Sequence, residues 1–188
     1  INADAPGILA RAIEKRGGTM VQISTDYVFD GEACKPYTEE SEVNPVSAYG
    51  RTKLAGEKAV LDACRNTVII RTAWLYSSFG HNFVKTMLKL GREREKLGVV
   101  FDQVGTPTYA RDLARAIVQI VSKPVVPGTY HFTDEGVTSW YDFTIAIHKL
   151  AGISTCKVSP LHTSDYPAPA RRPHYSVLDK TKIKQTFS

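Results

Sequence analysis

The stretch TVIIRT at residues 67–72 is a short, largely apolar run that is rich in β-branched side chains. A run of this length without polar alternation is typical of a strand in a parallel sheet, because helices cover both faces of such a sheet. TMVQIST at residues 19–25 has a similar length and character. The two runs therefore predict buried strands of a parallel sheet.

Helical patterns alternate with these strands along the chain. Gly17 and Gly18 end the first predicted helix, and Ser47 is expected to cap the N-terminus of the second, which continues to about residue 63. This alternation indicates βα units and hence an α/β fold with a mainly parallel, doubly wound sheet. After residue 153 the chain contains several prolines, and we expect it to be irregular. The remaining expected helices are residues 82–92, 109–121 and 139–150, and the remaining strands are residues 97–101 and 129–133.

The composition argues against several classes of protein. Of the 188 residues, 43% are hydrophobic and 23% are charged, as in an ordinary globular protein. No apolar run approaches the roughly 18 residues of a membrane span, and the net charge of +5 comes from scattered basic residues. The three cysteines lie far apart, which fits a reducing cytoplasm, and the five histidines form no pair with metal-ligand spacing. We therefore expect a cytoplasmic protein with no metal site, no membrane segment and no nucleic-acid partner.

Several polar and aromatic residues are expected to gather at one edge of the sheet. In doubly wound sheets, ligands bind beyond the carboxyl ends of the strands. Thr25, Asp26 and Tyr27 leave the first strand, and Trp74 follows the second. The helix between the two strands begins with SAYGRTK at residues 47–53, which holds Tyr49 near the same edge. The sequence therefore predicts a ligand site there.

Tyr49 and Lys53 are four residues apart, on one face of the predicted helix. A free tyrosine has a pKa of about 10, and a neighbouring ammonium group favours the phenolate and lowers that pKa. A hydroxyl from Thr25 or Ser24 could polarise the same substrate oxygen. Protonation of an oxygen while a hydride reaches its carbon is the work of a carbonyl reductase. The hydride must come from a nicotinamide, because no side chain carries one.

The segments that contain these residues resemble a known family. STDYVFDG at residues 24–31, NPVSAYGRTKLAGEKAV at residues 44–60 and RTAWLY at residues 71–76 are similar to segments of the extended short-chain dehydrogenase/reductases, and most of all to the dTDP-4-dehydrorhamnose reductases. The likeness covers nearly the whole chain. It continues through GTPTYARDLARAI at residues 105–117, GTYHFTDEGVTSWYDF at residues 128–143 and YPAPARRPHYSVLDKTKI at residues 166–183.

The resemblance implies a fold and an activity. The fold would be a Rossmann-like doubly wound parallel sheet with a smaller C-terminal substrate-binding region. The activity would be reduction of the C4 ketone of dTDP-4-dehydro-L-rhamnose to dTDP-L-rhamnose with NADPH or NADH. The partner would be a dTDP-linked 4-keto sugar. Whether the protein forms a homodimer is left open by the resemblance.

The resemblance also assigns roles to individual residues. Tyr49 would donate the proton, Lys53 would lower the pKa of Tyr49 and contact the nicotinamide ribose, and Thr25 would bind the substrate oxygen. The backbone of Ile23 would lie against the cofactor, together with Tyr49 and Lys53. A guanidinium fork fits phosphate oxygens, which favours an arginine at the diphosphate. The residues expected at the substrate are Thr25, Asp26, Tyr27, Trp74, Asn82, Arg171 and Arg172.

One departure from the family is clear. A reductase of this family should contain a Gly-rich turn that receives the cofactor pyrophosphate at a helix N-terminus, and this sequence has no GxGxxG or GxxGxxG. Its first residues align with a helix in the middle of the family's nucleotide domain. We therefore expect a fragment without the N-terminal βα units, inactive alone. Residues 1–78 would be the C-terminal part of the NAD(P)-binding domain, and residues 79–188 would mix the substrate-binding region with remaining sheet elements.

Other interpretations stay open at this point. The chain could come from another nucleotide-sugar 4-epimerase, dehydratase or reductase, or from a non-catalytic, reductase-like regulatory subunit. Thr25 could merely end a strand and cap a loop, and Tyr27 and Trp74 could be ordinary half-buried aromatic residues. The pair Arg171 and Arg172 could be solvated.

Overall fold

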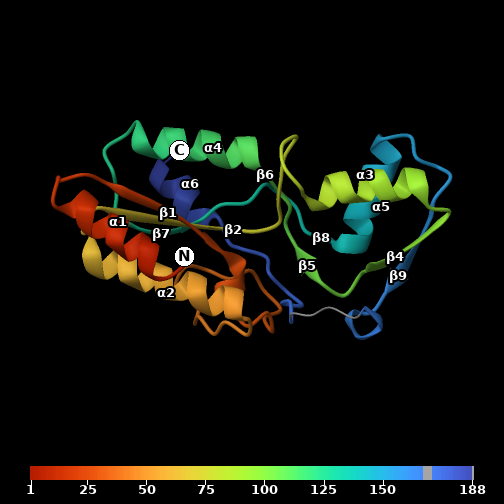
Figure 1. Cartoon of the computed structure of the whole chain (residues 1–188), viewed down its shortest axis with the longest axis horizontal. Coiled ribbons are helices and arrows are strands. Elements are labelled where there is room, and N and C mark those ends of the chain that lie inside the picture. The colour runs from red at the N-terminus through yellow and green to blue at the C-terminus, as the bar shows by residue number, and fades with distance from the viewer. Residues whose placement is uncertain (167–170, 188) are drawn as a thin grey trace.

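The computed structural model describes residues 1–166 and 171–187, and its centre is a three-stranded parallel sheet (Figure 1). The strands are β1 (Met20–Thr25), β2 (Thr67–Thr72) and β7 (Gly128–His131), in the order β1-β2-β7. Every residue of β2 is buried, as its continuous apolar pattern predicts. The expectation of a parallel sheet built from these runs is confirmed.

Helices cover both faces of this sheet (Figure 1). On one face lie α1 (Asp4–Glu14) and α2 (Ala48–Ala63), and on the other lie α4 (Ala110–Val121) and α6 (Thr181–Phe187). The fold is therefore doubly wound, as predicted. The core between the sheet, α4 and α6 consists of Val68, Ile70, Leu113, Ile120, Tyr130, Ile183 and Phe187.

The start of α2 is fixed tightly against the segment that follows β1. Ser47 Oγ accepts a hydrogen bond from Gly50 N at 3.0 Å, which confirms the predicted N-cap. Gly50 lies so close to the short 3₁₀ helix η1 (Asp26–Val28) that a Cβ there would fall 2.1 Å from Tyr27 O. Only glycine permits this approach. It brings Tyr49 beside the carboxyl end of β1.

A second, smaller core lies beside the sheet and contains α3 (Phe83–Glu93) and α5 (Trp140–Leu150) (Figure 1). These helices pack on a parallel pair, β4 (Lys96–Val100) and β9 (Lys157–Leu161). Within the described part of the chain, no helix combines the length and apolarity needed to cross a membrane. Short pairs connect the two cores: β3 (Leu75–Tyr76) with β6 (Thr108–Tyr109), and β5 (Val104–Gly105) with β8 (Thr138–Ser139).

The expectation that the chain is irregular after residue 153 is wrong. It contains β9, the 3₁₀ helix η2 (Thr163–Asp165) and α6. Pro160 is tolerated because β9 pairs with β4 alone and so forms an edge. The short α6 is stabilised by tertiary packing of Ile183 and Phe187 rather than by local propensity. Residues 167–170 of the expected segment lie outside the described residues.

Candidate functional site

A cluster of polar and aromatic side chains surrounds the carboxyl end of β1. Thr25 and Asp26 are buried, with Asp26 only 2% exposed, whereas Tyr49 on α2 is 50% exposed. The rings of Tyr27 and Tyr49 meet edge to face, with centroids 5.6 Å apart. The phenol of Tyr49 is therefore supported by the cluster on one side and accessible on the other, as a residue that meets a ligand must be.

The hydrogen bonds of Thr25 have a defined direction. Thr25 Oγ1 donates to Asp26 Oδ1 at 2.9 Å and accepts from Tyr27 N at 3.2 Å. The Thr25 hydroxyl also lies near the Tyr49 phenol, where it acts to lower the pKa of that phenol. Thr25 therefore lies between the buried carboxyl group of Asp26 and the exposed phenol of Tyr49.

Lys53 is not among the groups that shift the pKa of Tyr49 in this structure. Its Nζ donates to Ile23 O on β1 at 2.6 Å. Burial raises the pKa of Tyr49, the hydrogen bond with Thr25 opposes that rise, and the charge of Asp26 adds to it. The expected lowering of this pKa by Lys53 therefore stays a prediction. Helical spacing places the two residues on one face, but the long lysine side chain reaches across to the strand.

Lys53 itself is partly desolvated. Burial lowers its pKa, and the carboxylate of Glu57, one turn further along α2, opposes that shift. Its hydrogen-bond partner Ile23 O also accepts from Gln22 Nε2 at 3.0 Å. The ammonium group is therefore held against the outer strand of the sheet.

The residues at this edge fit a nicotinamide nucleotide. Among the described residues, β1 pairs with β2 on one side and has no strand on the other. Ser24 Oγ is buried there without a hydrogen-bond partner in the described part of the chain. An ammonium donor, a free hydroxyl and the backbone of Ile23 are the kinds of group that bind the hydroxyls and amide of such a cofactor.

Burial raises the pKa of Asp26 from its ordinary value of 3.8 to about 6, against the hydrogen bond from Thr25. Asp26 Oδ2 has no partner among the described residues. Desolvation therefore disfavours the charged carboxylate, and the protonated form is favoured in the folded protein up to mildly acidic pH.

This shift predicts a pH-dependent difference between the wild type and Asp26→Asn. Because the folded pKa is raised, the stabilising contribution of Asp26 is complete below pH 3.8 and is lost as the pH rises through about 6. From pH 4 to pH 7, the free energy of unfolding of the variant should therefore rise relative to the wild type by on the order of 3 kcal/mol. Urea unfolding at both pH values measures this difference.

Asp30→Asn is the matched control for this prediction. Hydrogen bonds from Glu32 N and the Tyr37 hydroxyl lower the pKa of Asp30. Its stabilising contribution is therefore lost as the pH falls, so this variant should show a difference of the opposite sign. Equal pH dependence of Asp26→Asn and the wild type would show that Asp26 is not a buried, desolvated acid.

A groove of about 830 Å³ lies beside the second core. Its walls are apolar and aromatic, with Phe83 and Trp140 among them, and its rim is cationic. The positive charge of Arg172 opposes the rise that burial and Asp26 impose on the pKa of Tyr27. Arg172 therefore lies near both the groove and the phenol cluster. The cationic residues that line the groove are Arg94, Lys96, Arg171 and Arg172.

Three of the predicted substrate residues have other partners in the structure. Asn82 caps α3: its Oδ1 accepts from Lys85 N at 3.1 Å and its Nδ2 donates to Ser77 O at 2.7 Å. Arg171 forms an exposed ion pair of 3.1 Å with Glu32, although it also lines the groove. The ring of Trp74 stacks on Trp140.

Sequence reasoning did not single out Trp140 or Gln103, which line the groove. Trp140 is the first residue of α5, and Gln103 lies just before β5. Neither has a local pattern that marks it as a ligand residue, because the groove forms only when segments far apart in the sequence come together.

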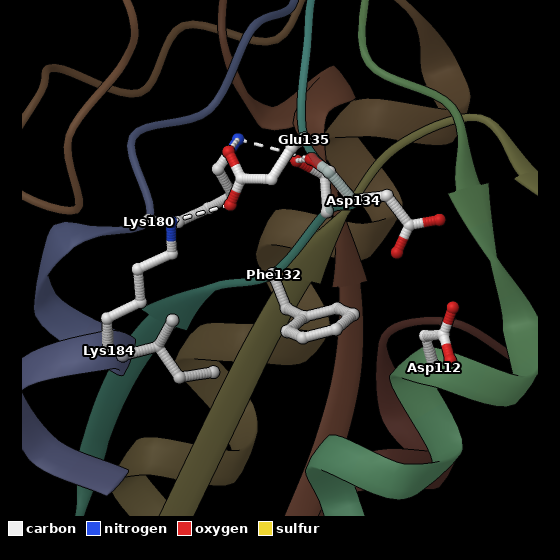
Figure 2. A pocket seen from close by; sticks show the side chains of 8 residues that line it. Asp112, Phe132, Asp134, Glu135, Lys180 and Lys184 are labelled. Carbon is white, nitrogen blue, oxygen red and sulfur yellow. Dashed lines mark hydrogen bonds and ion pairs between the residues drawn. The ribbon is translucent and has the colours of Figure 1, made fainter. Parts of the chain in front are cut away.

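A second hollow, of about 410 Å³, lies between α4, α6 and the segment after β7 (Figure 2). Figure 2 shows Asp112 and Asp134 on one side of it and Lys180 and Lys184 on the other. Lys184 Nζ lies 2.6 Å and Lys180 Nζ 3.5 Å from carboxylate oxygens of Glu135. These charges are satisfied within the protein. No group of three or more metal-ligating side chains occurs among the residues that the structure describes.

Comparisons with known proteins agree with this geometry. The profile of the RmlD substrate binding domain matches residues 1–188. A dTDP-4-dehydrorhamnose reductase of Aggregatibacter actinomycetemcomitans is 42% identical over the whole chain, which spans 67% of that protein. A solved dTDP-4-dehydrorhamnose reductase from Clostridium acetobutylicum is 52% identical, with a TM-score of 0.95, over 99% of this chain and 65% of that one.

A second solved structure carries a cofactor. A dTDP-4-dehydrorhamnose reductase from Bacillus anthracis in complex with NADP is 39% identical, with a TM-score of 0.96, and this chain covers 66% of it. The chain thus spans about two thirds of the length of these relatives. On the match over its full length, the chain belongs to the family of the RmlD substrate binding domain.

Proposed function

We propose that the chain supplies the catalytic tyrosine and the substrate-binding part of an NADPH- or NADH-dependent dTDP-4-dehydrorhamnose reductase. The observation that carries this proposal is the position of Tyr49. Its half-exposed phenol lies beside Thr25 at the carboxyl edge of a doubly wound sheet, and Arg172 links this edge to a groove lined by cationic residues. Doubly wound sheets bind their ligands at this edge.

The reaction adds a hydride to the C4 carbon of the keto sugar and a proton to its oxygen. A nicotinamide, when bound, supplies the hydride. Tyr49 gives its phenolic proton to the ketone oxygen, which becomes the hydroxyl of the product. Thr25 lies beside the phenol, and its own hydroxyl donates to Asp26. Lys53 and the backbone of Ile23 hold the cofactor side of the site.

The groove would hold the dTDP group. Aromatic side chains such as Phe83 and Trp140 suit a planar base, and the guanidinium groups of Arg171 and Arg172 suit a diphosphate. Trp74, at the end of β2, would flank the sugar between the groove and Tyr49. Asn82 would act through the cap of α3 rather than through a direct contact.

The chain would contribute to two parts of the enzyme. Residues 1–78 would complete a cofactor-binding domain with a segment that precedes them in the relatives, and residues 79–188 would form the substrate-binding region with the remaining sheet elements. The free thiols of Cys34, Cys64 and Cys156 support a reducing, cytoplasmic location. A homodimer would be compatible with this arrangement.

A fusion tests the proposed activity. The upstream third of the Clostridium acetobutylicum relative, placed before Ile1, should yield a protein that oxidises NADPH when dTDP-4-dehydro-L-rhamnose is added. The 188-residue chain alone should show no oxidation above background, because most of the cofactor contacts come from a Gly-rich turn that it does not contain. Loss of NADPH absorbance measures both.

Two results would contradict the proposal. A folded fusion that binds NADPH and leaves the keto sugar unchanged, while it co-purifies with another enzyme, would favour a regulatory subunit. A fusion that inverts C4 of a dTDP-sugar without net oxidation of NADPH would favour an epimerase.

A further inference from the structure

Trp74 has a strained backbone. Its φ of 49° is in the left-handed region, and among the described residues it is the only residue other than glycine with a positive φ. A bulky side chain seldom adopts this conformation, and it persists only where the surroundings hold it. Trp74 follows the last residues of β2, at the edge where Tyr49 lies, and its carbonyl accepts from Thr108 N at 3.2 Å.

Trp140 stacks directly on the ring of this strained residue. The two indoles stack with centroids 3.4 Å apart and planes 7° from parallel. Trp140 is itself held firmly, because Ser139 pairs with Val104 and caps α5 through Asp142 N at 3.0 Å. The stack therefore joins the strained Trp74 to the N-terminus of α5.

Gly105 leaves the space that the Trp74 ring needs. A Cβ at Gly105 would fall 2.7 and 2.8 Å from two atoms of that ring and 2.8 Å from Ser176 Oγ. Any other residue would displace the indole or Ser176. Gly105 on β5 therefore leaves room for the Trp74 ring, and Trp140 stacks on that same ring.

Trp140 also faces the groove. It lines the groove wall, and its ring lies 4.4 Å from that of Phe83 between centroids. We propose that Trp140 is a positioning residue: from the wall of the groove it holds Trp74 in its left-handed conformation just after β2, so that a nucleotide in the groove alters the Trp74 stack. This inference rests on the proposed function for the identity of the nucleotide.

The chain contains two tryptophans in all, so each single variant leaves one reporter. Acrylamide quenching of Trp74 fluorescence should be roughly twofold or more stronger in Trp140→Ala than in Trp140→Phe. The reason is that a phenyl ring at residue 140 still covers one face of the Trp74 indole, whereas an alanine does not. Equal quenching in the two variants would overturn the positioning role. Circular dichroism and thermal unfolding confirm that each variant is folded.

Gly105→Ala provides a second route if Trp140→Ala does not fold. Combined with Trp140→Phe, it should displace the Trp74 ring and raise the acrylamide quenching by a similar factor. Quenching that does not change in this double variant would contradict the inference that Gly105 and residue 140 hold the same ring.

Titration with dTDP tests the link to the groove. In Trp74→Phe, dTDP should change the emission of Trp140 directly, and in Trp140→Phe it should change the emission of Trp74 through the stack. A response of Trp140 without a response of Trp74 would overturn the link. If neither tryptophan responds and calorimetry detects no dTDP binding, the proposed nucleotide site fails, whereas the acrylamide comparison still decides the role of Trp140 in holding Trp74.

Discussion

Replacement of Tyr49 by phenylalanine should lower the turnover of the fusion protein by on the order of 10²–10⁴, with little change in the affinity for the dTDP-sugar. Phenylalanine keeps the ring and its edge-to-face contact with Tyr27 but removes the only proton that the site offers to a ketone oxygen from an accessible phenol. Initial rates of NADPH oxidation at saturating keto sugar measure the loss.

Tyr27→Phe is the matched control for this experiment. Tyr27 shares the edge-to-face contact, but its side chain is less exposed than that of Tyr49. Its loss should change turnover by less than about tenfold. If Tyr49→Phe retains the turnover of the unchanged fusion, Tyr49 is not the proton donor and the mechanism proposed for this edge is wrong.

Arg71→Ala should destabilise the chain by about 3–5 kcal/mol. Arg71 on β2 and Glu57 on α2 form a bidentate ion pair, with Nε–Oε1 at 3.0 Å and Nη2–Oε2 at 2.7 Å, and both side chains are almost completely buried. Removal of the guanidinium leaves a carboxylate without a partner in the core between helix and sheet. Denaturant unfolding of the 188-residue chain measures the loss directly.

Arg65→Ala provides the control for burial. Arg65 pairs with Glu14 at 2.8 Å, but its side chain is 93% exposed, and we expect a loss of stability far smaller than that of Arg71→Ala. The double variant Arg71→Met with Glu57→Leu should recover most of the loss of Arg71→Ala, because no charge then remains buried. A loss for Arg71→Ala no greater than that for Arg65→Ala would contradict this account.

The pair also influences its neighbours. Burial, with the charge of Arg71 as the next cause, lowers the pKa of His131 to about 3, so His131 stays neutral in the core. Glu57 lies one turn after Lys53 on α2 and opposes the drop in the pKa of that lysine. The buried pair of Arg71 and Glu57 therefore stabilises the packing of α2 on the sheet, and its Glu57 also favours the charged form of Lys53 at the edge where Tyr49 lies.

Local sequence patterns were sufficient to predict the parts of the fold that depend on near neighbours. The apolar run of β2 and the cap at Ser47 each act over a few residues, so the strand and the start of α2 could be predicted, and with them the place of Tyr49. The same local reasoning missed β9 and α6, which are stabilised by distant partners.

The amino-acid sequence by itself determined the alternation of helices and strands, the order of the sheet edge residues and the family likeness, because periodicity and capping are local properties of the chain. Only the tertiary structure decided that Lys53 binds Ile23 O, that the Thr25 hydrogen goes to Asp26, and that Trp140 covers Trp74. These contacts depend on where distant segments meet and on which donors burial leaves unsatisfied, and helical spacing or residue type does not specify either of them.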